Sequence, residues 1–437
     1  MNIAALYQQK LMDSVTACDV LHAADNLILG MGVAMPPALI QGVASLLRDS
    51  PKKHLNLYYM HGSQALSEHL LIPEFAEQLC PRPAFMSSHD RAAIKRFNQH
   101  NIVEFVPATF HQVGRLLTEQ ITPDVFMTTV SPMDKHGYFS LGTNADYGAS
   151  VIRKAKHVVV EVNEYMPRTF GECSVHISEI DSIVENHQPL MEFIGKPVTP
   201  IDETIASTIV EYIDDGDTLQ LGVGNVPYSV LHSLKNHKNL GLHSELFSSA
   251  MVDLIQDGVI NGRLKSWMQH KHVFTLALGD KAMYEFMDDN PSIVGYPASW
   301  VNNPSIIRKN RNMVSVNAAI EIDLSGQINA EEMAGHPFSG TGGQLDFVRG
   351  AYASQGGRSF IALHSTAKNE QLSKIVPRLN GATVTDTRMD THYVVTEYGC
   401  ANLKGLSLQQ RANALIHIAH PKFRDELMQQ AHSQGIF

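Results

Sequence analysis

One acidic residue, Glu245, follows a short apolar run and lies between two glycine-rich stretches, residues 222–226 (GVGNV) and 339–344 (SGTGGQ). A carboxylate can act as a nucleophile toward an activated acyl group. Turns rich in glycine let a ligand approach the backbone, so that N–H groups can bind an oxyanion or an anionic part of the ligand. Together these residues indicate covalent chemistry on an acyl group that is attached to an anionic carrier molecule. Taken alone, Glu245 also fits a solvated or helix-capping residue.

The second stretch holds three glycines in four residues: Gly340, Gly342 and Gly343. Glycine loses more conformational freedom on folding than any other residue, so an ordinary surface loop gains little from this composition. The backbone N–H groups of Gly342 and Gly343 are therefore candidate donors to the oxyanion of a tetrahedral intermediate. Removing one such donor raises the activation free energy by about 3–4 kcal/mol in other enzymes. A loop tip without a catalytic role is the structural alternative.

The first stretch belongs to an internal repeat. Residues 25–32 (DNLILGMG) and 217–224 (DTLQLGVG) are identical at five of eight positions, and Pro36 and Pro227 follow the two copies. Each copy is typical of a strand, a Gly-x-Gly turn and a helix whose first N–H groups can bind an anion. We therefore expect a duplicated α/β unit. Chance similarity between two strand–turn–helix units is the alternative.

The glycine spacing argues against a dinucleotide-binding fingerprint. The third glycine of G-x-G-x-x-G would fall at Met35 in the first copy and at Pro227 in the second. The turn at 222–226 then has two interpretations. It lets a phosphate-bearing ligand approach the backbone, or it is only a tight connection between a strand and a helix.

Apolar runs typical of strands buried on both faces occur at residues 124–130, 155–162, 314–320 and 359–363. Amphipathic helical stretches alternate with them, for example from 409 to 420, which predicts an α/β fold with mainly parallel sheets covered by helices. Prolines gather between residues 189 and 200, which indicates a linker. We therefore expect an N-terminal domain at 1–190 and a C-terminal domain at 200–437.

Composition excludes several classes of function. The 437 residues carry a net charge of -10 and are 44% hydrophobic, which is typical of a globular enzyme and argues against nucleic-acid or membrane-surface binding. The histidines show no H-E-x-x-H spacing and the four cysteines no C-x-x-C, so we expect no metal site and no disulfide framework. The first ten residues lack a basic, apolar leader, which favours a cytoplasmic location.

Several longer passages resemble the acetyl-CoA hydrolase/transferase family, and within it the 4-hydroxybutyrate and butyrate:acetate CoA-transferases. Besides the Glu245 segment, they are 130–142 (VSPMDKHGYFSLG), 161–169 (EVNEYMPRT), 338–350 (FSGTGGQLDFVRG) and 393–399 (YVVTEYG). The similarity extends over nearly the whole chain. It implies two related CoA-transferase-type α/β domains, with the catalytic glutamate in the C-terminal one.

The resemblance also implies roles for single residues. Glu245 is the glutamate that becomes a glutamyl-CoA thioester in a ping-pong reaction, with Gly342 and Gly343 beside it. The substrates are a short-chain acyl-CoA, such as acetyl-CoA or butyryl-CoA, and a short carboxylic acid such as 4-hydroxybutyrate. CoA is a substrate and no cofactor is tightly bound; a homodimer or higher homo-oligomer is expected. The residues expected to bind CoA are Gly222, Val223, Gly224, Asn225, Val226, Gly343 and Lys368.

One departure from the family pattern follows Glu245. Relatives commonly carry Ser-Asp-Gly where this chain has Ser248, Ser249 and Ala250. The change affects the expected turn beside the acyl pocket, so the sequence leaves the acid pair open. It also leaves open an acyl-CoA hydrolase that uses the same glutamate, and a non-catalytic CoA-binding protein.

Overall fold

The computed structural model describes residues 2–97, 102–193, 195 and 197–437. Its contacts divide the chain into two compact units. The first comprises Met1–Phe193, Phe247–Ser249 and Val273–Val301, and the second comprises Ile194–Leu246, Ala250–His272 and Asn302–Phe437. The boundary between 190 and 200 that we expected from the sequence lies where the first unit's main segment ends. The expected domain 200–437 nevertheless differs from the second unit, because residues 247–249 and 273–301 pack with the first.

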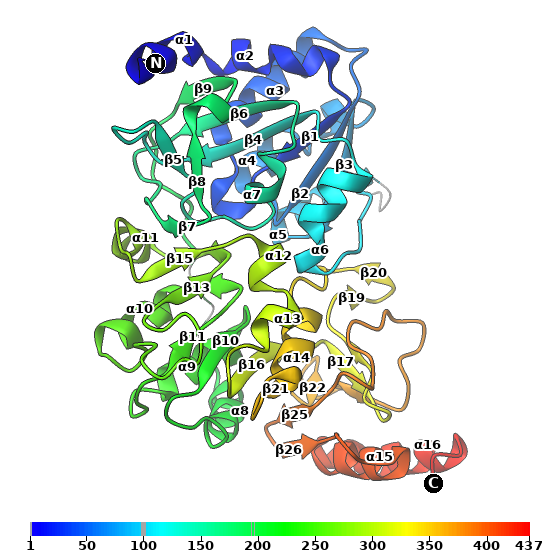
Figure 1. The fold of residues 1–437 in the computed structure, drawn as a ribbon. Coiled ribbons are helices and arrows are strands. Elements are labelled where there is room, and N and C mark those ends of the chain that lie inside the picture. Colours follow the sequence, from blue (N-terminus) through cyan, green and yellow to red (C-terminus); the bar gives the residue numbers. More distant parts are fainter. Residues whose placement is uncertain (1, 98–101, 194, 196) are drawn as a thin grey trace. The chain divides into compact units, whose positions relative to one another are not determined.

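The first unit is built on a six-stranded sheet in which every neighbouring pair is parallel (Figure 1). All six residues of the central strand β4 are buried, as expected for a parallel sheet covered on both faces. The strands, in spatial order, are β3 (Leu79–Phe85), β2 (Leu55–Met60), β1 (Asn26–Leu29), β4 (Val125–Val130), β6 (His157–Val162) and β9 (Ser182–Glu185).

The main helix of this unit is α3 (Pro37–Asp49), whose buried residues join the strands in one apolar core. The other helices of the unit are α1 (Ile3–Lys10), α2 (Ser14–Ala17), α4 (Gln64–His69), α5 (Ser88–Phe97), α6 (Phe110–Arg115), α7 (Gly148–Val151), α11 (Lys281–Met287) and α12 (Ala298–Val301). Its shorter strands include β5 (Tyr138–Ser140), β7 (Phe170–Gly171), β8 (Ser174–His176), β14 (Leu276–Ala277) and β15 (Ile293–Gly295).

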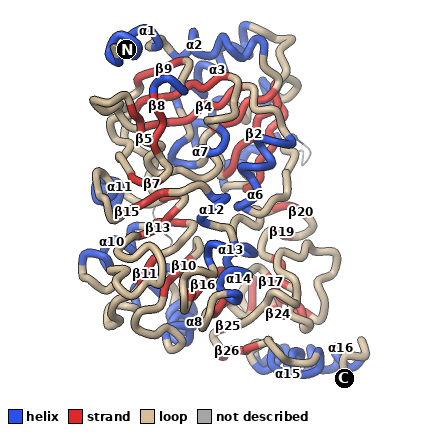
Figure 2. Tube along the Cα trace, viewed as in Figure 1, coloured by secondary structure: helices blue, strands red, loops and turns tan. Residues whose placement is uncertain are grey.

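The second unit also has a six-stranded sheet, parallel except for its last pair. In spatial order its strands are β11 (Gly241–Leu242), β10 (Thr218–Leu221), β16 (Met313–Ala318), β21 (Arg358–Ala362), β25 (Tyr393–Thr396) and β26 (Gly399–Asn402). The helices are α8 (Pro200–Val210), α9 (Asn225–Ser233), α13 (Pro304–Ile307), α14 (Gln344–Ala353), α15 (Leu408–His417) and α16 (Pro421–Ser433). In Figure 2, α15 follows β26 and α16 packs against α15.

Smaller pairings complete the second unit. They involve β17 (Glu321–Asp323), β18 (Ile328–Asn329), β19 (Glu332–Met333), β20 (His336–Pro337), β22 (Thr366–Ala367), β23 (Leu372–Ser373) and β24 (Ile375–Val376). The boundaries between the two units fall within β12 (Leu246–Phe247), α10 (Ser249–Gln256) and β13 (His272–Phe274), and after α12. Among the described residues, no helix is long and apolar enough to cross a membrane.

The sequence repeat occupies equivalent places in the two sheets. Strand β1 lies between β2 and β4, and β10 lies between β11 and β16. The first glycine of each Gly-x-Gly turn donates its N–H to the neighbouring strand, from Gly30 to Met127 O at 2.8 Å and from Gly222 to Val316 O at 2.9 Å. The duplication expected from the sequence therefore has a structural counterpart.

The two copies differ after the turn. In the second, α9 begins directly after Gly224. In the first, a 3-10 turn at Gly32–Ala34 precedes α3, which has Pro36 as its N-cap and begins at Pro37, and the Glu161 carboxylate accepts the N–H groups of Ala38 and Leu39 at 2.9 and 3.0 Å. Burial raises the pKa of Glu161 to about 7. Our expectation that both copies offer helix N–H groups to a ligand is therefore wrong for the first, where Glu161 already occupies them.

Candidate active site

Glu245 lies in the link between β11 and β12, at the carboxyl end of a parallel strand. The backbone before it is fixed to β10, because Gly241 donates to Asp217 O at 2.8 Å and His243 to Leu219 O at 3.1 Å. The ammonium group of Lys265 supports the same segment by donating to Leu242 O at 2.9 Å. In open α/β sheets this edge is where ligands bind.

Two donors hold the half-buried Glu245 carboxylate. The side-chain amide of Asn302 donates from Nδ2 to Glu245 Oε2 at 2.5 Å, and the backbone N–H of Gly343 also donates to the carboxylate. A Cβ atom on residue 343 would lie only 1.9 Å from Oε2 and 2.0 Å from Asn302 Nδ2. A glycine at position 343 is therefore required for this arrangement.

The electrostatic surroundings favour a proton on Glu245. Loss of hydration raises its pKa to about 7, the Asn302 and Gly343 hydrogen bonds act in the opposite direction, and the negative charge of Asp346 raises it further. Asp346 is buried in the first turn of α14. The carboxylate thus titrates near neutral pH, which is the range that general acid–base and nucleophilic groups of enzymes need.

The glycine loop turns sharply into α14. Gly342 has a φ of +53°, which favours glycine, and Gly343 is the N-cap of the helix. The next residue, Gln344, donates from Nε2 to Asp386 Oδ2 at 2.6 Å. Asp386 is fully buried, and burial raises its pKa to about 7. This contact fixes the first residue of the helix beside the two glycines.

The turn at 222–226 needs both of its glycines. A Cβ atom on Gly222 would lie 2.7 Å from Asn317 Oδ1, and Gly224 has a φ of +141°. No side chain caps α9, which begins at Asn225, and Val223 in the turn is 53% exposed. An uncapped helix N-terminus next to an exposed turn is suited to binding a phosphate group.

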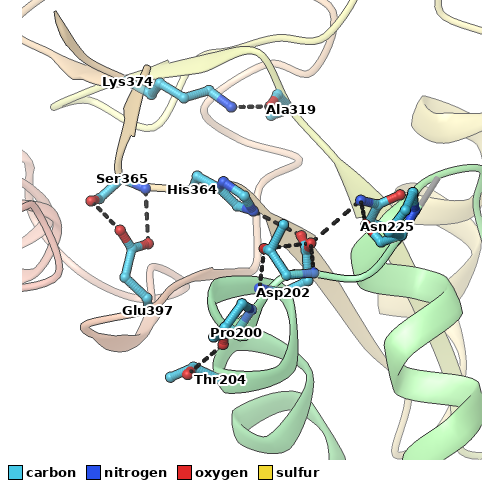
Figure 3. A network of polar contacts seen from close by, with 11 residues as sticks. Pro200, Asp202, Thr204, Asn225, Ala319, His364, Ser365, Lys374 and Glu397 are labelled. Atoms are coloured by element: carbon cyan, nitrogen blue, oxygen red, sulfur yellow. Dashed lines mark hydrogen bonds and ion pairs between the residues drawn. The ribbon is translucent and has the colours of Figure 1, made fainter. Parts of the chain in front are cut away.

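A polar network connects this turn to the end of β21 (Figure 3). Asn225 Nδ2 lies 3.4 Å from Asp202 Oδ2, and His364 Nε2 lies 2.8 Å from Asp202 Oδ1. Asp202 is buried in the first turn of α8. The next residue after His364, Ser365, donates from its N–H and hydroxyl groups to Glu397 at 2.9 and 2.6 Å.

Lys368 lies in the tight turn between β22 and β23, in the same unit as Glu245. It is exposed and has a φ of +51°, and the two following residues, Asn369 and Glu370, are also left-handed. Three consecutive non-glycine residues in this region are strained, and such strain gathers at functional sites.

The structure therefore brings two of the predicted residues, Glu245 and Gly343, into contact and places Gly342 next to them. The turn at 222–226 and Lys368 lie at other turns of the same unit. Sequence reasoning missed Asn302, which is 57 residues from Glu245 in the chain and carries no motif of its own. It also missed Asp346, although that residue is only three positions after Gly343.

Among the described residues, no group of histidine, cysteine and acidic side chains is arranged to hold a metal ion. The four cysteines are free. The arrangement around Glu245 is thus one carboxylate, one amide donor and one backbone donor. It can deliver a carboxylate oxygen to an electrophile while the other oxygen is held.

Several known proteins are similar to this chain in sequence and in fold. Residues 1–195 match the acetyl-CoA hydrolase/transferase N-terminal domain, and residues 279–431 match the C-terminal domain. The chain is 43% identical over 431 residues to succinyl-CoA:cyclohexane-1-carboxylate CoA transferase of Geobacter metallireducens, with 97% of this chain and 95% of that protein covered. It is 46% identical over 327 residues to 4-hydroxybutyrate coenzyme A transferase of Clostridium kluyveri, covering 74% and 76%.

A solved structure gives the same result for the fold. RipA from Yersinia pestis matches with a TM-score of 0.96 at 44% identity, over the full length of both chains. These similarities confirm the family resemblance that the sequence motifs indicated, and the α/β fold expected from it.

Proposed function

Because the chain belongs to the acetyl-CoA hydrolase/transferase family, we propose that it transfers CoA between a short-chain acyl-CoA and a short carboxylic acid. Acetyl-CoA or butyryl-CoA is the proposed donor and 4-hydroxybutyrate a proposed acceptor. The observation that carries the proposal is the Glu245 carboxylate, held by Asn302 and Gly343 at the carboxyl edge of the sheet. Two relatives at 43% and 46% identity are named CoA transferases.

The first step is attack by ionised Glu245 on the acyl-CoA carbonyl carbon. Because Asn302 binds Oε2, Oε1 is the attacking oxygen. The tetrahedral intermediate then expels CoA as a thiolate and leaves a mixed anhydride between Glu245 and the acyl group. The anhydride retains the activation of the thioester. Gly342, whose N–H lies next to that of Gly343 in the chain, is the proposed donor to the substrate oxyanion in this step.

In the second step the CoA thiolate attacks the glutamyl carbonyl carbon of the anhydride. Oε2 becomes the oxyanion, and it is the oxygen that Asn302 already binds. The adjacent Gly343 N–H is a second donor, so the two groups form a preorganised oxyanion hole. Collapse releases the free acid and leaves a glutamyl-CoA thioester on Glu245.

The acceptor carboxylate then reverses both steps. It attacks the glutamyl thioester, the thiolate leaves, and the thiolate returns to the acyl carbon of the new anhydride. The new acyl-CoA departs and Glu245 is regenerated as a carboxylate. Water must be kept from both intermediates, because hydrolysis would convert transfer into acyl-CoA hydrolysis.

Coenzyme A is the proposed ligand of the turn at 222–226 and of Lys368. The uncapped N-terminus of α9 suits a phosphate group, and the exposed Lys368 supplies a positive charge. Assembly as a homodimer and a cytoplasmic location stay predictions, which light scattering and cell fractionation would test.

The test is an assay that follows acyl-CoA species and free thiol together. The protein is incubated with butyryl-CoA alone, and then with acetate, 4-hydroxybutyrate or cyclohexane-1-carboxylate. A new acyl-CoA that appears only with the acceptor, without net thiol release, supports transfer. Thiol release that is independent of the acceptor would identify a hydrolase instead. Binding of CoA without turnover of any acyl-CoA would leave a non-catalytic CoA-binding protein.

A further inference from the structure

We propose that His364, held by Asp202, binds a phosphate group of CoA. The inference rests on the proposed function, because it takes CoA as the ligand of the second unit. No sequence motif pointed to His364. The argument comes from its position and from the single hydrogen bond that orients its ring.

The ring of His364 is oriented by a buried carboxylate. Nε2 lies 2.8 Å from Asp202 Oδ1, and the carboxylate can only accept, so Nε2 carries the proton. Asp202 is itself held by the N–H and hydroxyl groups of Thr199 at 2.9 and 2.7 Å. This leaves Nδ1, to which no residue in the described part of the chain is hydrogen-bonded. The side chain is 34% exposed, so a ligand can reach it.

The same carboxylate places His364 beside the uncapped helix. Asn225, the first residue of α9, contacts the other oxygen of Asp202 at 3.4 Å. Figure 3 shows Asn225 and His364 approaching Asp202 from two sides. His364 and the turn at 222–226 therefore both lie at the carboxyl edge of the sheet, after β21 and β10 respectively. The two features share this edge, with β16 between their strands, and Asp202 is the residue that contacts both.

Two charged groups near His364, Glu397 and Lys374, have hydrogen-bond partners of their own (Figure 3). Glu397 is occupied by Ser365, and Lys374 donates to Ala319 O at 3.3 Å. Burial lowers the pKa of Lys374, although Glu397 and Glu321 oppose the shift. When Nδ1 also carries a proton, it can donate a hydrogen bond to an anion, and the ring then lies between two negative groups, Asp202 and the phosphate. Such charge-assisted hydrogen bonds are stronger than neutral ones.

CoA offers phosphate in two places, the 3′-phosphate of its ribose and its diphosphate. Acyl-pantetheine carries the reacting thioester without either. CoA, dephospho-CoA, which lacks the 3′-phosphate, and S-butyryl-pantetheine, which lacks both, therefore distinguish a contact to phosphate from a contact to the reacting end. His364 takes no part in bond making or breaking, so substituting it should change the affinity for CoA and not the chemical steps.

The experiment compares His364→Gln with the wild-type protein. Glutamine can donate to Asp202 as Nε2 does, but it cannot become a cation. We expect roughly 10-fold weaker binding of CoA by calorimetry, the size of a lost hydrogen bond to a charged group. His364→Lys should recover most of this loss. His417→Gln, at an exposed histidine near the end of α15, is the matched control and should bind CoA as the wild type does.

The ligand series decides the result. If the loss disappears with dephospho-CoA, His364 binds the 3′-phosphate. If it persists with dephospho-CoA, and the kcat/KM for S-butyryl-pantetheine is the same in both proteins, His364 binds the diphosphate. An equal loss with S-butyryl-pantetheine, or no loss with CoA, overturns the proposal. Calorimetric binding of CoA and dephospho-CoA needs no turnover, so that comparison is independent of whether Glu245 transfers CoA.

Discussion

A side chain on residue 343 and the Glu245 carboxylate cannot occupy the structure together, because a Cβ atom there would lie 1.9 Å from Oε2. This makes the glycine loop part of the carboxylate's environment. Residue 343 has no side chain, so the loop can lie close to Glu245 and the backbone N–H of Gly343 can donate a hydrogen bond to its carboxylate. The chemistry proposed for Glu245 therefore depends on a residue that has no side chain.

Gly343→Ala should remove most of the transfer activity. The methyl group displaces the carboxylate or the loop, and the oxyanion donor is lost with it, so we expect a fall in kcat of about 10²–10³-fold. Gly195→Ala is the control, because nothing lies within 4 Å of its Cβ position. Steady-state kinetics of both variants check the prediction, and near-normal turnover by Gly343→Ala would contradict it.

Asn302→Ala should slow the steps in which Oε2 carries negative charge. The loss expected from removing one oxyanion donor is about 10²-fold or more in kcat. The neighbouring Asn303 accepts from Ser305 N–H at 2.9 Å as the N-cap of α13, and no hydrogen bond joins it to Glu245 in the described part of the chain. Asn303→Ala should therefore lose about 1 kcal/mol of stability while keeping its activity. Kinetics and thermal unfolding of the two variants distinguish a catalytic role from a structural one. Normal activity in Asn302→Ala together with lost activity in Asn303→Ala would contradict the prediction.

The pH dependence of kcat/KM for the acyl-CoA should report Glu245. Its pKa is raised to about 7, and the ionised form is the nucleophile, so activity should rise as pH increases through this value. Removing the nearby negative charge with Asp346→Asn should lower the pKa and move the rising limb to lower pH. A profile that is flat from pH 5 to 8 in the wild type would mean that Glu245 does not limit the reaction.

Glu245→Gln should abolish transfer and yet stabilise the protein at neutral and alkaline pH. The folded pKa of Glu245 lies above the usual value of 4.5, so ionisation opposes folding as pH rises from about 4.5 to 7. Glutamine avoids this cost and can still accept from Asn302. The difference in melting temperature between variant and wild type should grow over that pH range. A constant difference would show that the burial of the charge has no effect on stability.

Much of the fold could be predicted because its signals are local. The apolar runs at 124–130, 155–162, 314–320 and 359–363 each overlap a strand of one of the two large sheets, to within two residues at either end. The repeat identified β1 and β10 as counterparts. Local sequence could not show that residues 273–301 pack with the first unit, since that grouping depends on contacts between distant segments.

The candidate site divides in the same way. Glu245 and the glycine loop stand out by residue type and spacing, so the sequence indicated both. Asn302 and His364 do not, because each acquires its place only through a partner far along the chain, Glu245 and Asp202 respectively. Glu161 shows the opposite error. The two copies have the same turn in sequence, but a carboxylate from β6 fills one of them.

The most direct test of the account is to trap the intermediate on Glu245. The protein is incubated with butyryl-CoA without an acceptor, reduced with borohydride, digested and analysed by mass spectrometry. A glutamyl thioester is reduced to an alcohol, so the account predicts this mass change on the peptide that contains Glu245, and none in Glu245→Gln. Modification of a different residue, or formation of new acyl-CoA by Glu245→Gln at the wild-type rate, would contradict it.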